Sequence, residues 1–431
     1  MVVSAGTFCC REKLPEPEYN SIFFMQKIKL YLGLILIFFS LCQLYSQDDS
    51  LSVENEPVMP DQETTYNDNA GKSFEFSGYL KFLNATSFSD LDYLANDNLI
   101  HNRLNFKTYL TENLTIDLQI RNRILWGASL SIPGYKDLVE PESEIKLSSF
   151  LIDKPGLLMH SKIDRLYLNY NYKNLEFRIG RQRLNWGKAW AWNSNDLFNA
   201  YNFLDYDYEE RPGSDAISVL YNTGSGSFVQ GAYSYGSSFD KSIFALRSQF
   251  NISSYDIQLL AAHYFQDIAL GLGWEGNIKN IGFKGESTVF IPEKSDFEEK
   301  TAVLTSVSFD YFFTNGYGIL GSVLHNSNGV DDINELTALF SRGESLNARN
   351  LMPNKWSLMI QNSYEINPAS TCSLGVLYLA DINALALLPM VTYTISNDWD
   401  FNFIGQLFFL ENDDRLKNLQ NNLVLRFRYS F

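Results

Sequence analysis

Side chains that could carry acid–base, nucleophilic or metal chemistry are sparse in this chain of 431 residues and form no recognisable catalytic pattern. None of the four histidines belongs to an HExxH motif or stands at zinc-ligand spacing from a cysteine. They are His101, His160, His263 and His325. The sequence has no GxSxG nucleophile elbow and no Walker phosphate-binding loop. We therefore expect no catalytic residue, no bound metal and no cofactor.

One cluster of acids could hold calcium or act as paired carboxylates. It consists of Asp205, Asp207, Glu209 and Glu210. The chain carries 50 Asp and Glu residues against 34 Lys and Arg, so such clusters arise readily by chance. The resulting net charge of −16 also argues against a nucleic-acid partner. A hydrolase would instead need one of the histidines beside a serine and a carboxylate in the folded chain.

Basic side chains recur in mid-segment, opposite large apolar residues, with a period of two. In the segment 100–110, Ile, Leu and Phe alternate with a face that carries Arg103 and Lys107. The segment 113–124 does the same with Arg121 and Arg123. Alternation indicates strands, and an apolar outer face over a charged inner face fits a closed membrane barrel around water. The 15% aromatic content suits the interface belts of such barrels.

The N-terminal region predicts export. Residues 30–44 are apolar, follow a short basic segment and are too few for a spanning helix, so we expect a signal peptide over 1–47. Residues 1–24 precede Met25, which we take as the true start. Residues 48–70 are acidic and poor in apolar side chains, which predicts a disordered leader. The barrel then occupies 71–431.

The barrel region predicts eighteen antiparallel strands, with sixteen as the alternative. Every second connection is tight, whereas the long connections 84–99, 125–162, 185–214 and 327–354 all fall in the other set. Short turns on the periplasmic side and longer loops outside are the rule for these barrels, which places both termini in the periplasm. The terminal Phe431 resembles the signal read by the outer-membrane barrel assembly machinery.

If apolar residues face lipid, the first five strands and the last one line the lumen with one arc of cations. We call it the basic wall; it consists of Lys81, Arg103, Lys107, Arg121, Arg123, Arg165, Arg178, Arg426 and Arg428. The wall is expected to organise a field across a water-filled pore. The simpler alternative is that these residues only keep the lumen hydrated or pair with residues that fill it.

The connection 185–214, here called the constriction loop, is rich in aromatic residues that would be costly in water. We expect it to fold into the barrel, with Asp205, Asp207, Glu209 and Glu210 facing the basic wall. A loop packed over the outer rim is the alternative. The predicted loop residues are Trp186, Trp190, Trp192, Asp196 and these four acids.

The segment 177–215 resembles the GRQxxxWG…WNxxDxF segment of porin-like outer-membrane barrels from Bacteroidetes-type and other Gram-negative bacteria. The matching residues are Gly180, Arg181, Gln182, Trp186, Gly187, Trp192, Asn193, Asp196 and Phe198. The family often has a proline shortly after this motif, where Ala200 stands here. Arg181 and Arg183 share parity with apolar Phe177, so we expect a bulge at Gly180 that turns them away from lipid.

The resemblance implies an outer-membrane channel for passive diffusion of small polar or anionic solutes, surrounded by lipid. General porins are often trimers, which leaves a homo-oligomer open by analogy. The alternative function is a barrel closed by the constriction loop that serves in export, attachment or assembly of surface polysaccharide.

Overall fold

The computed structural model describes residues 73–89, 93–140, 144–199, 207, 213–224, 226–294, 300–332, 346–412 and 415–431. The expected signal peptide (1–47) and acidic leader (48–70) lie outside these residues and stay predictions. Within the described ranges, no helix combines the length and the apolar character needed to cross a membrane.

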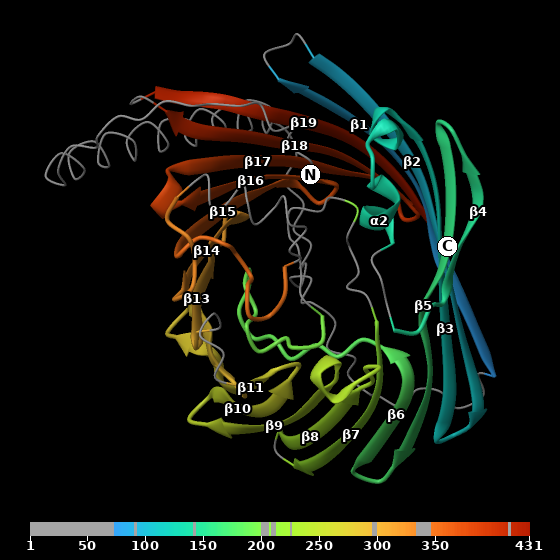
Figure 1. Ribbon diagram of the computed structural model, residues 1–431, viewed down its shortest axis with the longest axis vertical. Helices are drawn as coiled ribbons and strands as arrows, with labels where there is room; N and C mark the ends of the chain where they lie inside the picture. The colour runs from blue at the N-terminus through green and yellow to red at the C-terminus, as the bar shows by residue number, and fades with distance from the viewer. Residues whose placement is uncertain are drawn as a thin grey trace, which may run out of the picture.

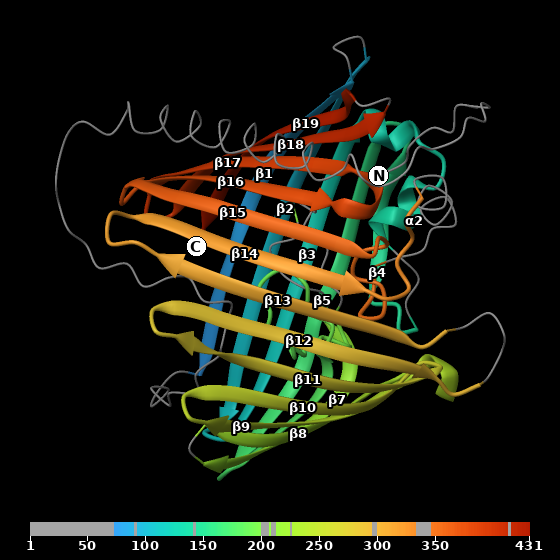
Figure 2. The same cartoon turned by 90° about the vertical axis from the view of Figure 1, so that its left-hand side faces the viewer.

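Most of the described chain lies in one antiparallel sheet that closes on itself. Figure 1 looks into the ring, and Figure 2 shows the strands inclined across its side. The ring closes where β1 pairs with β19, with Tyr79 opposite Ser430. Eighteen strands form the closed barrel, as predicted, so the alternative of sixteen is wrong.

The barrel strands follow one another in chain order. They are β1 (Phe74–Ser89), β2 (Tyr93–Thr111), β3 (Leu114–Gly127), β5 (Leu157–Tyr172), β6 (Leu175–Gln182), β7 (Ser214–Gly224), β8 (Ser227–Ser234), β9 (Ile243–Ile252), β10 (Tyr255–Tyr264), β11 (Asp267–Ile278), β12 (Ile281–Pro292), β13 (Ala302–Phe312), β14 (Tyr317–Asn326), β15 (Trp356–Asn367), β16 (Ser370–Leu379), β17 (Ala384–Ser396), β18 (Trp399–Asn412) and β19 (Arg415–Ser430).

Among the described residues, one further strand and four short helices lie in the connections. Strand β4 (Ser148–Lys154) pairs with the first half of β5, on the same edge that β6 occupies along the second half. The helices are η2 (Ala128–Ser131), α2 (Tyr135–Val139), η3 (Phe239–Lys241) and η4 (Ala380–Ile382).

The outer surface of the barrel is apolar because alternate side chains of each strand point away from the lumen. Large hydrophobic residues such as Leu80, Leu246 and Leu270 are about half exposed there. Aromatic residues gather at the end of the barrel that carries the tight turns, as in an interface belt. Those with exposed rings are Phe74, Phe76, Tyr170, Tyr172, Tyr221, Phe312, Phe313, Tyr393, Trp399 and Phe431.

Tight turns join β2 to β3 and every second strand pair after it, as the sequence predicts, and the start of β1 and the end of β19 lie at this same end. Lys173, Ser253, Ser254 and Lys279 have positive φ in these turns, as two-residue hairpins require. The placement of this end in the periplasm stays a prediction.

Two of the expected long loops are partly strand. The prediction of a loop over 84–99 is wrong, because β1 and β2 remain paired as far as Ser89 and Tyr93. This part of the hairpin lacks alternation; its outward Asn84 and Asn98 instead hydrogen-bond each other across the strands. The loop expected at 125–162 contains β4 and the start of β5.

Candidate functional site

The first half of the constriction loop lies inside the barrel, against the inner face of β9–β13, here called the far wall (Figure 1). Trp186 and Trp192 are buried, with 0% and 2% of their surface exposed. Gln258 of β10 donates a hydrogen bond to the carbonyl oxygen of Trp186 at 2.9 Å, and Ser306 of β13 donates to that of Trp192 at 2.6 Å. The alternative in which the loop packs over the outer rim is therefore wrong for this half.

The loop turns at Asn195, and two parts of the far wall contact this turn. Gly271 and Gly273 of β11 leave room for its side chain, since a Cβ at Gly271 would stand 2.3 Å from Asn195 Oδ1. Glu286 of β12 accepts hydrogen bonds from backbone amides of the loop, including Asn195 N at 2.8 Å and Ala189 N at 3.0 Å. Reasoning from the sequence assigned these far-wall residues no role.

The residues of the family-like segment contact one another. Asp196 accepts a hydrogen bond from Trp186 N at 3.2 Å, and the Phe198 ring packs edge-on against Trp186 with centroids 5.1 Å apart. A Cβ at Gly187 would collide with the side chain of Asn193. The motif thus folds the loop back on itself. The guanidinium carbon of Arg247 on β9 lies 5.0 Å from the centre of the Trp186 ring. Trp190 packs against the buried hydrophobic cluster that contains Trp186 and Trp192.

Arg181 is buried, but the expected bulge at Gly180 is not present. Both ladders of β6 pass through Gly180 and Arg181 without a register shift, so no extra residue is inserted. Gly180 has φ of +122°, and a Cβ there would stand 2.2 Å from the carbonyl oxygen of Leu166. Arg181 is 4% exposed because its guanidinium pairs with Asp215 and donates to the carbonyl oxygen of Ile145.

Gln182 sits one residue further along β6 and is fully buried. Its side-chain amide donates to the carbonyl oxygen of Ala216 at 2.9 Å, and its oxygen accepts from Ser218. Gly180, Arg181 and Gln182 therefore fix the strand from which the constriction loop departs.

At the opposite side of the lumen, Asp207 contacts the basic wall. Its Oδ1 lies 2.9 Å from Lys81 Nζ and 2.9 Å from His101 Nδ1. Burial would raise the pKa of Asp207, but the hydrogen bond from His101 and the charge of Lys81 hold it well below its usual range. The other predicted acids, Asp205, Glu209 and Glu210, lie outside the described residues.

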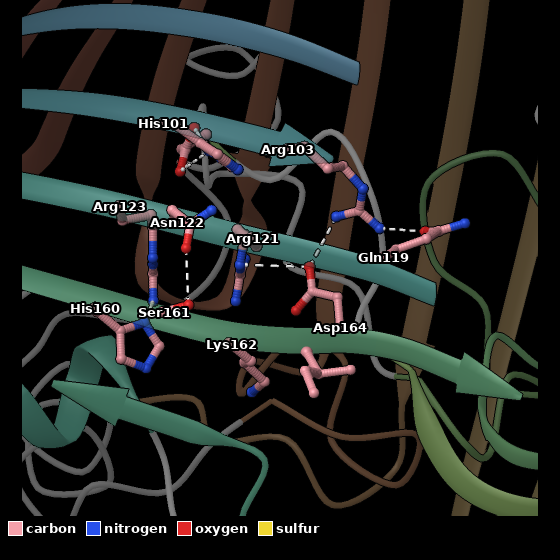
Figure 3. Close-up of polar contacts among 12 residues, drawn as sticks. His101, Arg103, Gln119, Arg121, Asn122, Arg123, His160, Ser161, Lys162 and Asp164 are labelled. Carbon is pink, nitrogen blue, oxygen red and sulfur yellow. Dashed lines mark hydrogen bonds and ion pairs between the residues drawn. The ribbon is translucent and has the colours of Figure 1, made fainter. Parts of the chain in front are cut away.

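The middle of the basic wall is a ladder of paired charges across β2, β3 and β5 (Figure 3). Arg103 Nη1 donates to Asp164 Oδ2 at 2.8 Å, and Arg121 Nε lies 3.4 Å from the same oxygen. A register shift in β5 places Asp164 as an extra residue between Ile163 and Arg165. Lys162 was not expected in the wall because the predicted loop extended to residue 162, and Asp164 was not expected because the extra residue reverses the alternation of the strand.

The outer end of the ladder is tied to the connection that holds α2. Arg123 Nη2 donates to the carbonyl oxygen of Val139 at 2.6 Å, and Glu140 lies 3.2 Å from both His160 Nε2 and Lys162 Nζ. Burial by itself would raise the pKa of Glu140. The hydrogen bond from His160 and the charge of Lys162 have the larger effect and lower the pKa to about 2.

The remaining basic-wall residues lie beside this ladder, Arg426 and Arg428 on β19 and the others on β2, β5 and β6. Arg428 stands opposite Lys81, and its guanidinium lies 4.8 Å from the centre of the Tyr79 ring. Arg426 Nε donates to Asn402 at 2.9 Å. Arg178 forms an ion pair with Glu176, Lys107 stands opposite Asp117, and Arg165 stands opposite Gln119.

The described residues do not assemble a hydrolase site. None of the four histidines hydrogen-bonds both a serine and a carboxylate in the part of the chain that the structure covers; His101 contacts Tyr79 and Asp207, for example. Over the same residues, no group of three or more His, Cys, Asp or Glu side chains could hold a metal ion.

Solved structures with a similar fold include chains named as an outer-membrane protein and as a porin. The chain resembles OprD from Pseudomonas aeruginosa with a TM-score of 0.55 and 9% identity, over 83% of this chain and 93% of that one. It resembles OccK5 (OpdH) from the same organism with a TM-score of 0.54 and 8% identity, over 83% and 98%. A BenF-like porin from Pseudomonas fluorescens gives a TM-score of 0.54 and 10% identity, over 83% and 99%. Neither a known family profile nor a curated protein sequence matches the chain.

Proposed function

We propose that this chain is a porin-like outer-membrane channel through which small polar solutes, anions included, diffuse passively. The observation that carries the proposal is a closed barrel whose lumen holds a loop attached to both sides. Trp186 and Trp192 hold the loop to the far wall, and Asp207 reaches Lys81 of the basic wall. Such a loop narrows a lumen, and the cations beside it favour anions.

The location and partners follow from the exterior of the barrel. Half-exposed leucines and the belt of aromatic rings require lipid around the strands. The structural neighbours that are named as an outer-membrane protein and as a porin support a location in the outer membrane. We further propose that the family-like segment marks a relationship to Bacteroidetes-type porins and that Phe431 is read by the assembly machinery.

Electrical recording in planar lipid bilayers tests the proposal directly. The purified barrel should produce discrete current steps, and the reversal potential in a salt gradient should show a preference for anions. A variant in which residues 186–212 are replaced by a short Gly-Ser linker should conduct more and discriminate less.

The outcome that contradicts the proposal is equally plain. A correctly folded barrel that carries no current in bilayers would favour the closed barrel acting on surface polysaccharide. Unchanged conductance and selectivity in the loop-deleted barrel would remove the constriction loop from the mechanism.

A further inference from the structure

Glu286 is a carboxylate inside the barrel wall whose hydrogen bonds, among the described residues, come from backbone amides. It lies on the inner face of β12 and its side chain is fully buried. Both of its oxygens accept N–H groups of the constriction loop: Oε1 from Lys188 and from Ala189, Oε2 from Asn195. Three donors separated by up to seven positions in the loop thus converge on one wall side chain.

The neighbouring wall residues receive the loop in the same place but through fewer hydrogen bonds. The Thr288 hydroxyl lies 2.8 Å from both Ser194 Oγ and Asn195 Oδ1, and Asn195 Nδ2 donates to the carbonyl oxygen of Leu272 at 3.2 Å. Glu286 instead accepts from three backbone amides of the loop. Glu286 is therefore the wall side chain with the most hydrogen bonds to this part of the loop.

We propose that Glu286 is the positioning residue that holds the constriction loop on the far wall and so sets the width of the pore. The inference rests on the proposed channel function and deepens it. A carboxylate suits the task because both of its oxygens accept. A carboxamide at this position would turn an N–H group toward one of the loop amides, leaving two donors face to face.

The direct test is the accessibility of the loop to a water-soluble maleimide. Ala191 is 7% exposed and lies between the loop residues that Glu286 binds, so Ala191→Cys, with Cys372→Ala in the background, reports whether the loop is seated. With wild-type Glu286 the introduced thiol should be protected. Glu286→Gln should speed labelling about 10- to 100-fold, since leaving a buried N–H donor without an acceptor shifts the opening equilibrium by about that factor.

Asp256→Asn is the matched control. Asp256 is a lumen-side carboxylate on β10 that accepts hydrogen bonds from the side-chain amides of Gln249 and Asn251 on the neighbouring strand. Neutralising it removes one charge from the same wall without touching the loop, so the thiol introduced at position 191 should stay protected. Labelling as fast as in Glu286→Gln would mean that any loss of charge loosens the wall, which would overturn the inference.

A second variant guards against a barrel that fails to assemble. Ala189→Pro removes one N–H donor from the loop and leaves every strand unchanged. Folded barrels are identified by their heat-modifiable migration on gels. If assembled Glu286→Gln or Ala189→Pro barrels protect the thiol as well as wild type does, Glu286 does not position the loop. The labelling result stands whether or not the wild-type barrel conducts, so failure of this inference and failure of the proposed function are distinguishable.

Discussion

Asp207 of the constriction loop and Lys81 of β1 form an ion pair with 2.9 Å between Oδ1 and Nζ, although 126 residues separate them in the chain. The Lys81 side chain is fully buried and that of Asp207 is 13% exposed. The pair joins the loop to the wall opposite its main attachment. Breaking it tests whether this second attachment limits the pore.

Replacing Lys81 by Met should release the Asp207 end of the loop and raise the conductance. Removing one partner of a buried pair costs about 3–5 kcal/mol where the other charge is left unpaired, and the hydrogen bond from His101 that remains on Asp207 should keep the loss below that range. The double variant Lys81→Met/Asp207→Asn should recover part of that loss in stability, which a double-mutant cycle on thermal unfolding measures. Lys136→Gln, which changes an exposed lysine near the barrel rim, is the control. Strictly additive effects would show that the pair is not coupled.

Removing the carboxylate of Asp164 should make the channel more selective for anions. Asp164 lies 2.8 Å from Arg103 and 3.4 Å from Arg121, so Asp164→Asn leaves both guanidiniums without their shared counter-charge. The reversal potential in a salt gradient should shift toward the anion value. Asp153→Asn, half exposed on β4, provides the comparison. An identical shift of the reversal potential in both variants would show that the paired charges of the ladder do not affect ion selectivity.

The attachment of α2 to the wall should depend on pH through Glu140. Its pKa of about 2 in the folded chain is lower than the ordinary value of 4.5, so the stabilisation is complete above the ordinary value. It is lost as pH falls from there toward 2. The protection factors of residues 135–140, which correct for the intrinsic pH dependence of amide exchange, should be high near about pH 6 and fall near about pH 3. Glu140→Gln should give low protection factors at both values; wild-type protection factors that do not change with pH would contradict the assignment.

The last residue should matter for closing the barrel. Phe431 N donates to the carbonyl oxygen of Gly78 at 3.0 Å, Gly78 N donates back at 2.9 Å, and the Phe431 ring packs 5.5 Å from that of Phe76. Deleting Phe431 removes two backbone hydrogen bonds, about 0.5–1.5 kcal/mol each, together with the ring. Phe431→Ala removes only the ring. Comparing their folded fractions on unheated gels separates the two contributions; wild-type folding in both variants would show that the terminal residue is dispensable.

The strand pattern was predictable because each strand carries its own alternation. The predicted connections 185–214 and 327–354 fall between β6 and β7 and between β14 and β15. The prediction failed where strands lose alternation, as in the paired residues up to Ser89 and Tyr93. There the hydrogen-bond ladder continues because the preceding residues of β1 and β2 hold the two strands in register. The local sequence carries no sign of this continued pairing.

The candidate site was predictable only in part. The sequence predicted that the aromatic loop residues enter the barrel, because exposing Trp186 and Trp192 to water is costly whatever surface they pack against. The attachment points did not follow, because Glu286 and Gly271 acquire their roles only once the far wall curves toward the loop. Asp164 was hidden for a related reason: an extra residue in β5 reverses the parity on which the assignment depended.

The seam between β1 and β19 has a consequence for how the channel comes into being. Lys81 and Arg428 stand directly opposite each other across it, and like charges in that arrangement repel. Asp207 beside Lys81 and Asp400 opposite Arg428 supply counter-charges at this junction. The two ends of the sheet can therefore join without leaving a pair of like charges uncompensated.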